Sequence, residues 1–92
     1  MAISNVNVEN TVTPIVSENG YRDSMTIQHV DTTDGNVAIW VSTNPAMTVG
    51  QGFYVSALGG VFSTDRENGA ANAWYGISAG NTVTIVVATG EN

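Results

Sequence analysis

The chain has 92 residues, of which 42% are hydrophobic and 11% are charged, so it fits one small folded domain and excludes a two-lobed enzyme or a disordered chain. Eight acidic residues stand against two arginines, Arg22 and Arg66, and the net charge is −6. Two cations cannot neutralise a row of phosphates, which excludes nucleic acid and anionic membrane surfaces as partners. Without cysteine the chain forms no disulfide, so a domain this small gains stability from packing or from subunit contacts.

The first twenty residues are the least regular part of the chain. Residues 1–10 are rich in asparagine, and their apolar positions Ile3, Val6 and Val8 fit either an added strand or an arm that contacts the rest of the protein. A short strand is predicted over 12–17, where Pro14 cannot donate to a β-ladder and favours an edge position or a strand start. We therefore separate an N-terminal arm or extra strand, residues 1–20, from a main domain, residues 21–92.

Two stretches of alternating character follow, over residues 24–31 and 36–43. Their inner faces are predicted to hold Met25, Ile27, His29, Val37, Ile39 and Val41. Between them, Asp34 and Gly35 form a strong turn signal, because a tight hairpin needs two residues that accept a positive φ. The sequence therefore predicts that these two strands pair as a hairpin.

The second half of the chain repeats the pattern. Weaker strands are predicted over 51–57, with Phe53 and Val55 inward, and over 60–64, after a turn at Gly59 and Gly60. A second hairpin is predicted from 71–77 and 83–87, joined by a turn at 79–81. Its inner positions are Ala71, Ala73, Tyr75, Ile77, Val83, Ile85 and Val87.

Six to eight short strands, with no window of helical periodicity, predict an all-β protein. A single sheet would leave one apolar face uncovered, so we expect a small antiparallel two-sheet β-sandwich, jelly-roll-like or Ig-like. The longest apolar run, residues 37–41, is far too short to span a membrane, and residues 1–6 lack the basic start of a secretory signal.

Catalytic and metal-binding chemistry has little support. His29 is the single imidazole of the chain, and its place beside Met25 and Ile27 favours a hydrogen-bonded histidine near a strand end over a catalytic or metal-binding one. No serine lies in a Gly-x-Ser-x-Gly turn. The acidic pairs have neither the spacing of a calcium loop nor a cysteine or second histidine nearby, and are interpreted as a turn cap and a solvated hairpin tip: Asp31 with Asp34, and Asp65 with Glu67. We expect no enzyme activity, no metal and no cofactor.

The tryptophans are more informative. The predicted alternation turns Trp40 and Trp74 away from the inner faces, so each needs a cover. The cover is either the N-terminal segment of the same chain, another protein subunit or a stacked sugar ring. Because tryptophan is enriched at interface hot spots, a protein contact that includes Trp40, Trp74 and Tyr54 is favoured over glycan stacking.

The stretch from Ser24 to Gly90 resembles the small β-sandwich proteins of tailed-phage virions, of the capsid decoration (cement) and head-fibre type. The resemblance is carried by the segment 26–41, by the Gly-Phe segment 51–55 and by the strand-turn-strand segment 73–87. It covers about three quarters of the chain, excludes the first twenty residues and gives no site residue to carry over.

What the resemblance implies is a non-enzymatic structural protein. It is made in the host cytoplasm and placed in the virion, on the outer surface of the capsid. There it binds the major capsid protein and stabilises contacts between capsid subunits, as a homo-oligomer for which a trimer is favoured. A carbohydrate-binding or adhesin-like sandwich, with Trp40, Tyr54 or Trp74 as stacking platform, and a tail or baseplate adaptor remain the alternatives.

Overall fold

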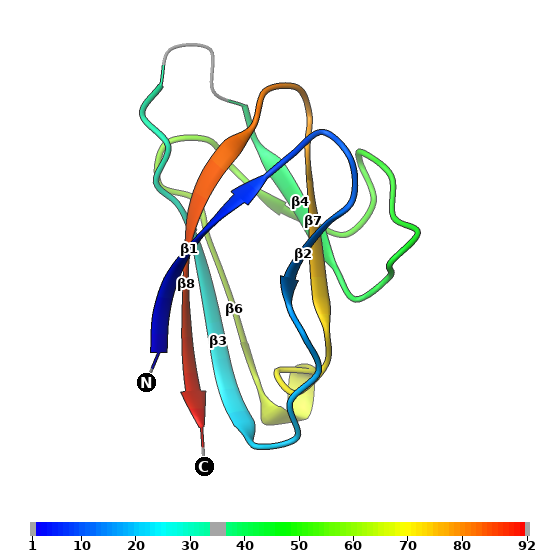
Figure 1. Ribbon diagram of the computed structural model, residues 1–92, viewed down its shortest axis with the longest axis vertical. Coiled ribbons are helices and arrows are strands. Elements are labelled where there is room, and N and C mark those ends of the chain that lie inside the picture. The colour runs from blue at the N-terminus through cyan, green and yellow to red at the C-terminus, as the bar shows by residue number, and fades with distance from the viewer. Residues whose placement is uncertain (1, 34–36, 92) are drawn as a thin grey trace.

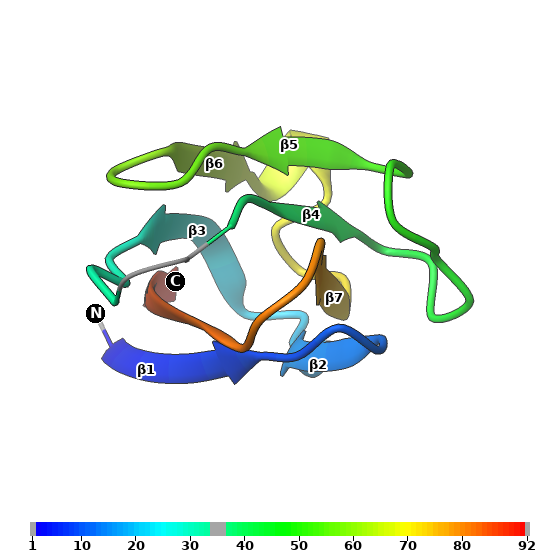
Figure 2. The same ribbon diagram turned by 90° about the horizontal axis from the view of Figure 1, so that it is seen from above.

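The computed structural model describes residues 2–33 and 37–91, which form two antiparallel sheets packed face to face (Figures 1 and 2). The predicted all-β sandwich is confirmed. In chain order the strands of the described residues, with one short 3₁₀ helix (η1), are β1 (Ala2–Val8), β2 (Thr13–Val16), β3 (Arg22–His29), β4 (Ile39–Ser42), β5 (Phe53–Val55), β6 (Val61–Asp65), η1 (Arg66–Asn68), β7 (Trp74–Ser78) and β8 (Val83–Glu91).

The topology is that of a jelly roll. One sheet has the strand order β1-β8-β3-β6 and the other β2-β7-β4-β5. The first strand therefore pairs with the last, the second with the seventh, the third with the sixth and the fourth with the fifth, like one long hairpin rolled into two layers. In this arrangement consecutive strands change sheet at every connection except the one between β4 and β5.

Both predicted hairpins are therefore wrong, although their strands exist. Strand β3 pairs with β6 and β8, whereas β4 lies in the other sheet with β5 and β7. Likewise β7 and β8 belong to different sheets. The turn predicted at Asp34 and Gly35 lies outside the described residues. The segment that follows β7 leads to the other sheet instead of turning back within its own.

The core lies between the sheets and follows the predicted alternation on most strands. Met25, Ile27 and His29 of β3 are buried together, and so are the alternate valine and isoleucine residues of β8. The buried apolar cluster consists of Val8, Ile15, Met25, Ile27, Ile39, Val41, Val55, Trp74, Val83, Ile85 and Val87. Burial of these side chains is the main force that holds the two layers together.

Strand β7 departs from the prediction. Its register with β4 places Gly76 opposite Val41, so Trp74 and Gly76 face the core, while Tyr75 and Ile77 lie on the outer face. The prediction that Trp74 points away from the core is therefore wrong. A Cβ atom on Gly76 would lie 2.8 Å from Cδ1 of Ile15, which shows that an isoleucine from β2 fills the space above this glycine.

The N-terminal segment forms two edge strands. Residues 2–8 are β1, paired along their whole length with β8, and β2 pairs with β7 through a register shift between Pro14 and Val16. Val8 belongs to the core, Val6 packs partly against it, and Ile3 is exposed. Pro14 lies on an edge strand, as predicted, where its missing N–H costs no ladder hydrogen bond.

Candidate binding surfaces at the edge between β5 and β6

The sandwich has two open sides, and they differ in chemistry. Strands β1 and β2 lie along one side and β5 and β6 along the other (Figure 2). Exposed large apolar side chains gather on or beside the second side: Tyr54 is 61% exposed, Val61 is 56% exposed, and Leu58, in the loop that joins β5 to β6, is 72% exposed. Unpaired apolar edge strands of this kind are ready to pair with another molecule.

Tyr54 has an aromatic neighbour on the outer face of its sheet. Trp40 of β4 lies opposite Tyr54 of β5 in register, and their ring centroids are 5.4 Å apart in an edge-to-face arrangement. Trp40 is half-buried by this contact and its register partner on the other side is Ile77 of β7. We call Trp40, Tyr54, Leu58 and Val61 the β5–β6 rim.

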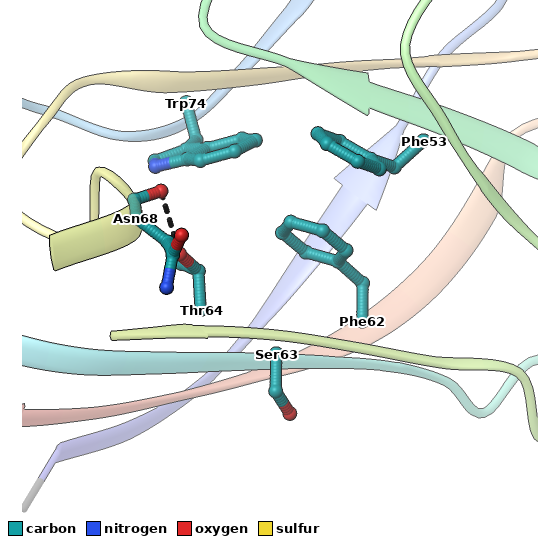
Figure 3. A pocket seen from close by; sticks show the side chains of 6 residues that line it. All are labelled: Phe53, Phe62, Ser63, Thr64, Asn68 and Trp74. Carbon is teal, nitrogen blue, oxygen red and sulfur yellow. Dashed lines mark hydrogen bonds between the residues drawn. The ribbon is translucent and has the colours of Figure 1, made fainter. Parts of the chain in front are cut away.

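The side chain before Tyr54 points the other way and lines a pocket. Phe53 faces the gap between the sheets, as predicted, yet it is 56% exposed because β5 is an edge strand. Its ring stacks on Phe62 of β6, with centroids 4.8 Å apart, and Phe62 lies 5.1 Å from Trp74. Figure 3 shows the three rings turned toward one another, with Ser63 pointing away. The pocket has a volume of about 260 Å³.

The predicted contact of Trp40, Tyr54 and Trp74 is thus divided between two places. Trp40 and Tyr54 meet on an outer face, whereas Trp74 is 3% exposed and forms the inner wall of the pocket. Its indole N–H donates to the carbonyl oxygen of Gly69 at 2.9 Å, so the same chain covers it. The intrachain cover expected from the sequence was the N-terminal segment, whereas Gly69 lies just before β7.

Phe53 and Phe62 form the part of the site that sequence reasoning did not assign. The sequence pattern predicts a weak strand over 60–64, which includes Phe62 without a role, and assigns Phe53 only to the inner face. The available signal was the pair of Gly59 and Gly60 between two short strands that each carry one phenylalanine. A jelly-roll crossing at this loop brings the two rings together from different sheets.

His29 and Asp31 have the structural roles predicted from the sequence, whereas the acidic segment at Asp65 differs. Nε2 of the buried His29 lies 2.9 Å from the carbonyl oxygen of Val37, while Nδ1 has no hydrogen-bond partner in the described part of the chain. Asp31 accepts from the backbone N–H of Thr33, as expected for a turn cap. Asp65 accepts from the backbone N–H of Asn68 and caps η1, so this acidic segment is an exposed helical turn between the two sheets and the predicted hairpin tip is wrong.

Neither a metal site nor a membrane helix is found in the described ranges. Within residues 2–33 and 37–91, no three histidine, aspartate or glutamate side chains come together as a metal site requires. No helix in the same ranges has the length and apolar character needed to cross a bilayer. Comparisons with protein families, with curated proteins and with solved structures find no match for this chain.

Proposed function

We propose that this protein is a non-enzymatic capsid decoration protein of a virion, which binds the major capsid protein on the outer surface of the head through its β5–β6 rim. The observation that carries the proposal is the presence of Tyr54, Leu58 and Val61, each more than half exposed, on or between two edge strands that each have one free edge. Aromatic side chains such as tyrosine, once an interface buries them, are among the residues that supply most of the binding energy.

The opposite side of the sandwich supports this choice of surface. There, β2 carries Pro14 and a register shift, and the outward positions of β1 hold Asn5 and Asn7 beside a single exposed apolar residue, Ile3. Proline, irregular register and polar side chains are features that keep an edge strand from pairing. The β5 and β6 strands contain no proline and pair with β4 and β3 without a register shift, so their free edges keep the ability to add a partner.

The fold and the net charge also support a role in a virion, but they do not indicate which surface binds the capsid. Jelly rolls are frequent in viral capsid proteins and in lectins, which is an argument by analogy alone. A net charge of −6 disfavours attachment to the nucleic acid that virions release. In a cyclic trimer each subunit uses two different patches, and a trimer that contacts several capsid subunits gains avidity from modest individual contacts.

Co-sedimentation with capsids assembled without this protein tests the proposal. We expect wild-type protein to pellet with the capsids, and the substitutions Tyr54→Ser and Leu58→Ser each to weaken binding by about tenfold, which corresponds to the loss of one interface anchor. Tyr21→Ser is the matched control, because Tyr21 is 73% exposed but lies in the loop between β2 and β3.

The outcomes separate the alternatives. Protein that stays in the supernatant with capsids but pellets with isolated tails contradicts the decoration role and favours the tail or baseplate adaptor. Equal losses for Tyr54→Ser and Tyr21→Ser contradict the assignment of the rim.

A further inference from the structure

The pocket behind the rim has a lining that protein docking through Tyr54 and Leu58 leaves unused. Phe53, Phe62 and Trp74 surround it with carbon surfaces, and the Trp74 nitrogen is already bonded to the Gly69 carbonyl oxygen. Such rings offer flat faces to a ligand that itself has an apolar face. The half-exposed Phe53 ring stands at the edge of the pocket and leaves it open to solvent.

A second hollow adjoins the aromatic pocket and is lined by polar side chains alone. It has a volume of about 290 Å³ and lies over paired positions of β3 and β6, where Ser24 is opposite Asp65 and Thr26 is opposite Ser63. Three residues, Ser63, Thr64 and Asn68, line both spaces. A ligand that fills both must therefore present an apolar face to the first and hydrogen-bonding groups to the second.

The charges around the two spaces restrict the ligand further. Asp65 is the charged residue of the lining, and the next cation in the sequence, Arg66, donates from Nε to Asp23 at 2.6 Å. A carboxylate attracts hydroxyl donors and repels anions. Within the hollow the Thr26 and Ser63 hydroxyls share one hydrogen bond at 3.1 Å, and the Asn68 side-chain amide donates to Asp65 at 2.7 Å. A hydroxyl has one hydrogen and two lone pairs, so these groups can form further hydrogen bonds that an apolar protein side chain would leave unused.

We propose that the pocket and the hollow together bind a neutral oligosaccharide. One sugar ring places its C–H face against the exposed surface of Phe53, which stacks on Phe62. The next ring crosses the free edge of β6 and places its hydroxyl groups against Ser24, Thr26, Ser63 and Asp65 on the outer face of the sheet. Pockets that combine apolar walls with a few convergent polar groups are typical of small-molecule sites. This inference does not rest on the capsid-binding proposal. Phe53 of the pocket and Tyr54 of the rim lie on opposite faces of β5, and the two proposed sites meet at β6, where Val61 and Ser63 share the outer face.

Tryptophan fluorescence of the full chain tests it. The chain has two tryptophans, so the variant Trp40→Phe leaves Trp74 as the single reporter. The probes are neutral hexose, pentose and N-acetylhexosamine tetrasaccharides, each with its monosaccharide, and an acidic uronic-acid tetrasaccharide. We expect a saturable change in Trp74 emission with at least one neutral tetrasaccharide, weaker binding of its monosaccharide and no response to the acidic one.

Matched variants in the same background locate the site. Phe53→Ala is expected to weaken tetrasaccharide binding by about tenfold, whereas Tyr54→Ala, its neighbour on the opposite face of β5, leaves it unchanged. Ser63→Ala is expected to weaken binding of the tetrasaccharide more than of the monosaccharide. The proposal is overturned if no neutral saccharide changes the emission at millimolar concentration, if N-acetyl-phenylalanine amide competes better than the sugars, or if Phe53→Ala and Tyr54→Ala bind equally.

Discussion

Arg22 is a buried cation whose partners are backbone carbonyl oxygens. The side chain is 5% exposed, and its guanidinium donates to the carbonyl oxygens of Ser17, Ala70 and Asn72 at 2.8, 3.0 and 3.2 Å. These three acceptors lie in the segment before β3 and in the segment before β7. The guanidinium group of Arg22 thus holds together two segments that each connect one sheet to the other.

Arg22→Met is expected to lower the free energy of unfolding by about 3 kcal/mol, because one buried and two partly buried hydrogen bonds from a charged donor are lost. Arg22→Lys should recover only part of the loss, since an ammonium group lacks the forked geometry that reaches all three. Urea unfolding of the three proteins measures this. Ordinary surface substitutions change stability by less than about 0.5 kcal/mol. A loss within that range for Arg22→Met would show that the Arg22 hydrogen bonds do not stabilise the fold.

Asp31 joins the segment after β3 to β8. Its carboxylate accepts from the backbone N–H groups of Thr33 at 2.8 Å and Thr84 at 3.0 Å. The hydrogen bond from Thr84 and then those from Thr33 hold the pKa of Asp31 below its ordinary value of 3.8. Because the folded pKa is the lower one, the stabilisation is complete above the unfolded value and is lost as the pH falls through the folded value.

Asp31→Asn is therefore expected to be less stable than the wild type at neutral pH, since one amide oxygen replaces two charged acceptors. The difference should shrink as the pH falls below the ordinary carboxyl range, where the wild-type side chain also becomes neutral. Thermal unfolding of both proteins across an acid series measures it. Parallel curves for the two proteins would contradict this role of the charge.

The β5–β6 loop carries local backbone strain at an exposed residue. Leu58 has a φ of +61°, a left-handed conformation that costs a leucine energy, and it is followed by Gly59 at +104°. Backbone hydrogen bonds of Gly59 and Gly60 to His29 of β3 hold the loop in place. A strained, exposed leucine between two apolar edge strands fits a residue kept for binding at the expense of stability.

The substitution Leu58→Asn tests whether Leu58 contributes to binding while lowering the stability of the fold. Asparagine accepts the left-handed conformation more readily, so the variant is expected to be more stable by about 1 kcal/mol and to bind capsids more weakly than the wild type. Chemical denaturation and co-sedimentation of the same preparation measure the two quantities. Increased stability with unchanged capsid binding would separate Leu58 from the interface.

The positions of the strands were largely predictable from the sequence, but the face of β7 that is buried was not. Alternation over 74–78 is real, but its phase is inverted, because glycine and serine occupy the inner positions beside Trp74. The cause is Ile15, which fills the space over Gly76 from the neighbouring strand. Only the pairing of β2 with β7 brings that side chain there, so the pattern within β7 could not indicate it.

At the scale of the whole molecule, the fold class was predictable and the connections were not. Alternating apolar and polar residues indicate that a strand has one buried face, but they do not indicate which other strand packs against that face. In a rolled hairpin, strands distant in sequence pair, and the turn after a strand more often crosses to the other sheet than returns along the same one. The pocket of Phe53, Phe62 and Trp74 depends on such crossings, which is why sequence analysis did not find it.

Oligomerisation should be visible in the stability of the whole protein. A domain of 92 residues without disulfides buries a modest core, and the β5–β6 rim remains exposed in the isolated chain. If subunits associate, mass action raises the melting temperature with protein concentration. We expect this rise by calorimetry in the wild type. A melting temperature independent of concentration would contradict the homo-oligomer.

The most direct test of the docking surface is oxidative footprinting of the protein, free and bound to capsids assembled without it. Capsid binding through the β5–β6 rim predicts that Trp40, Tyr54 and Leu58 lose reactivity on the capsid while Tyr21 keeps it. Protection of Tyr21 with unchanged reactivity at Tyr54 and Leu58, or no bound protein to footprint, would contradict the proposed function.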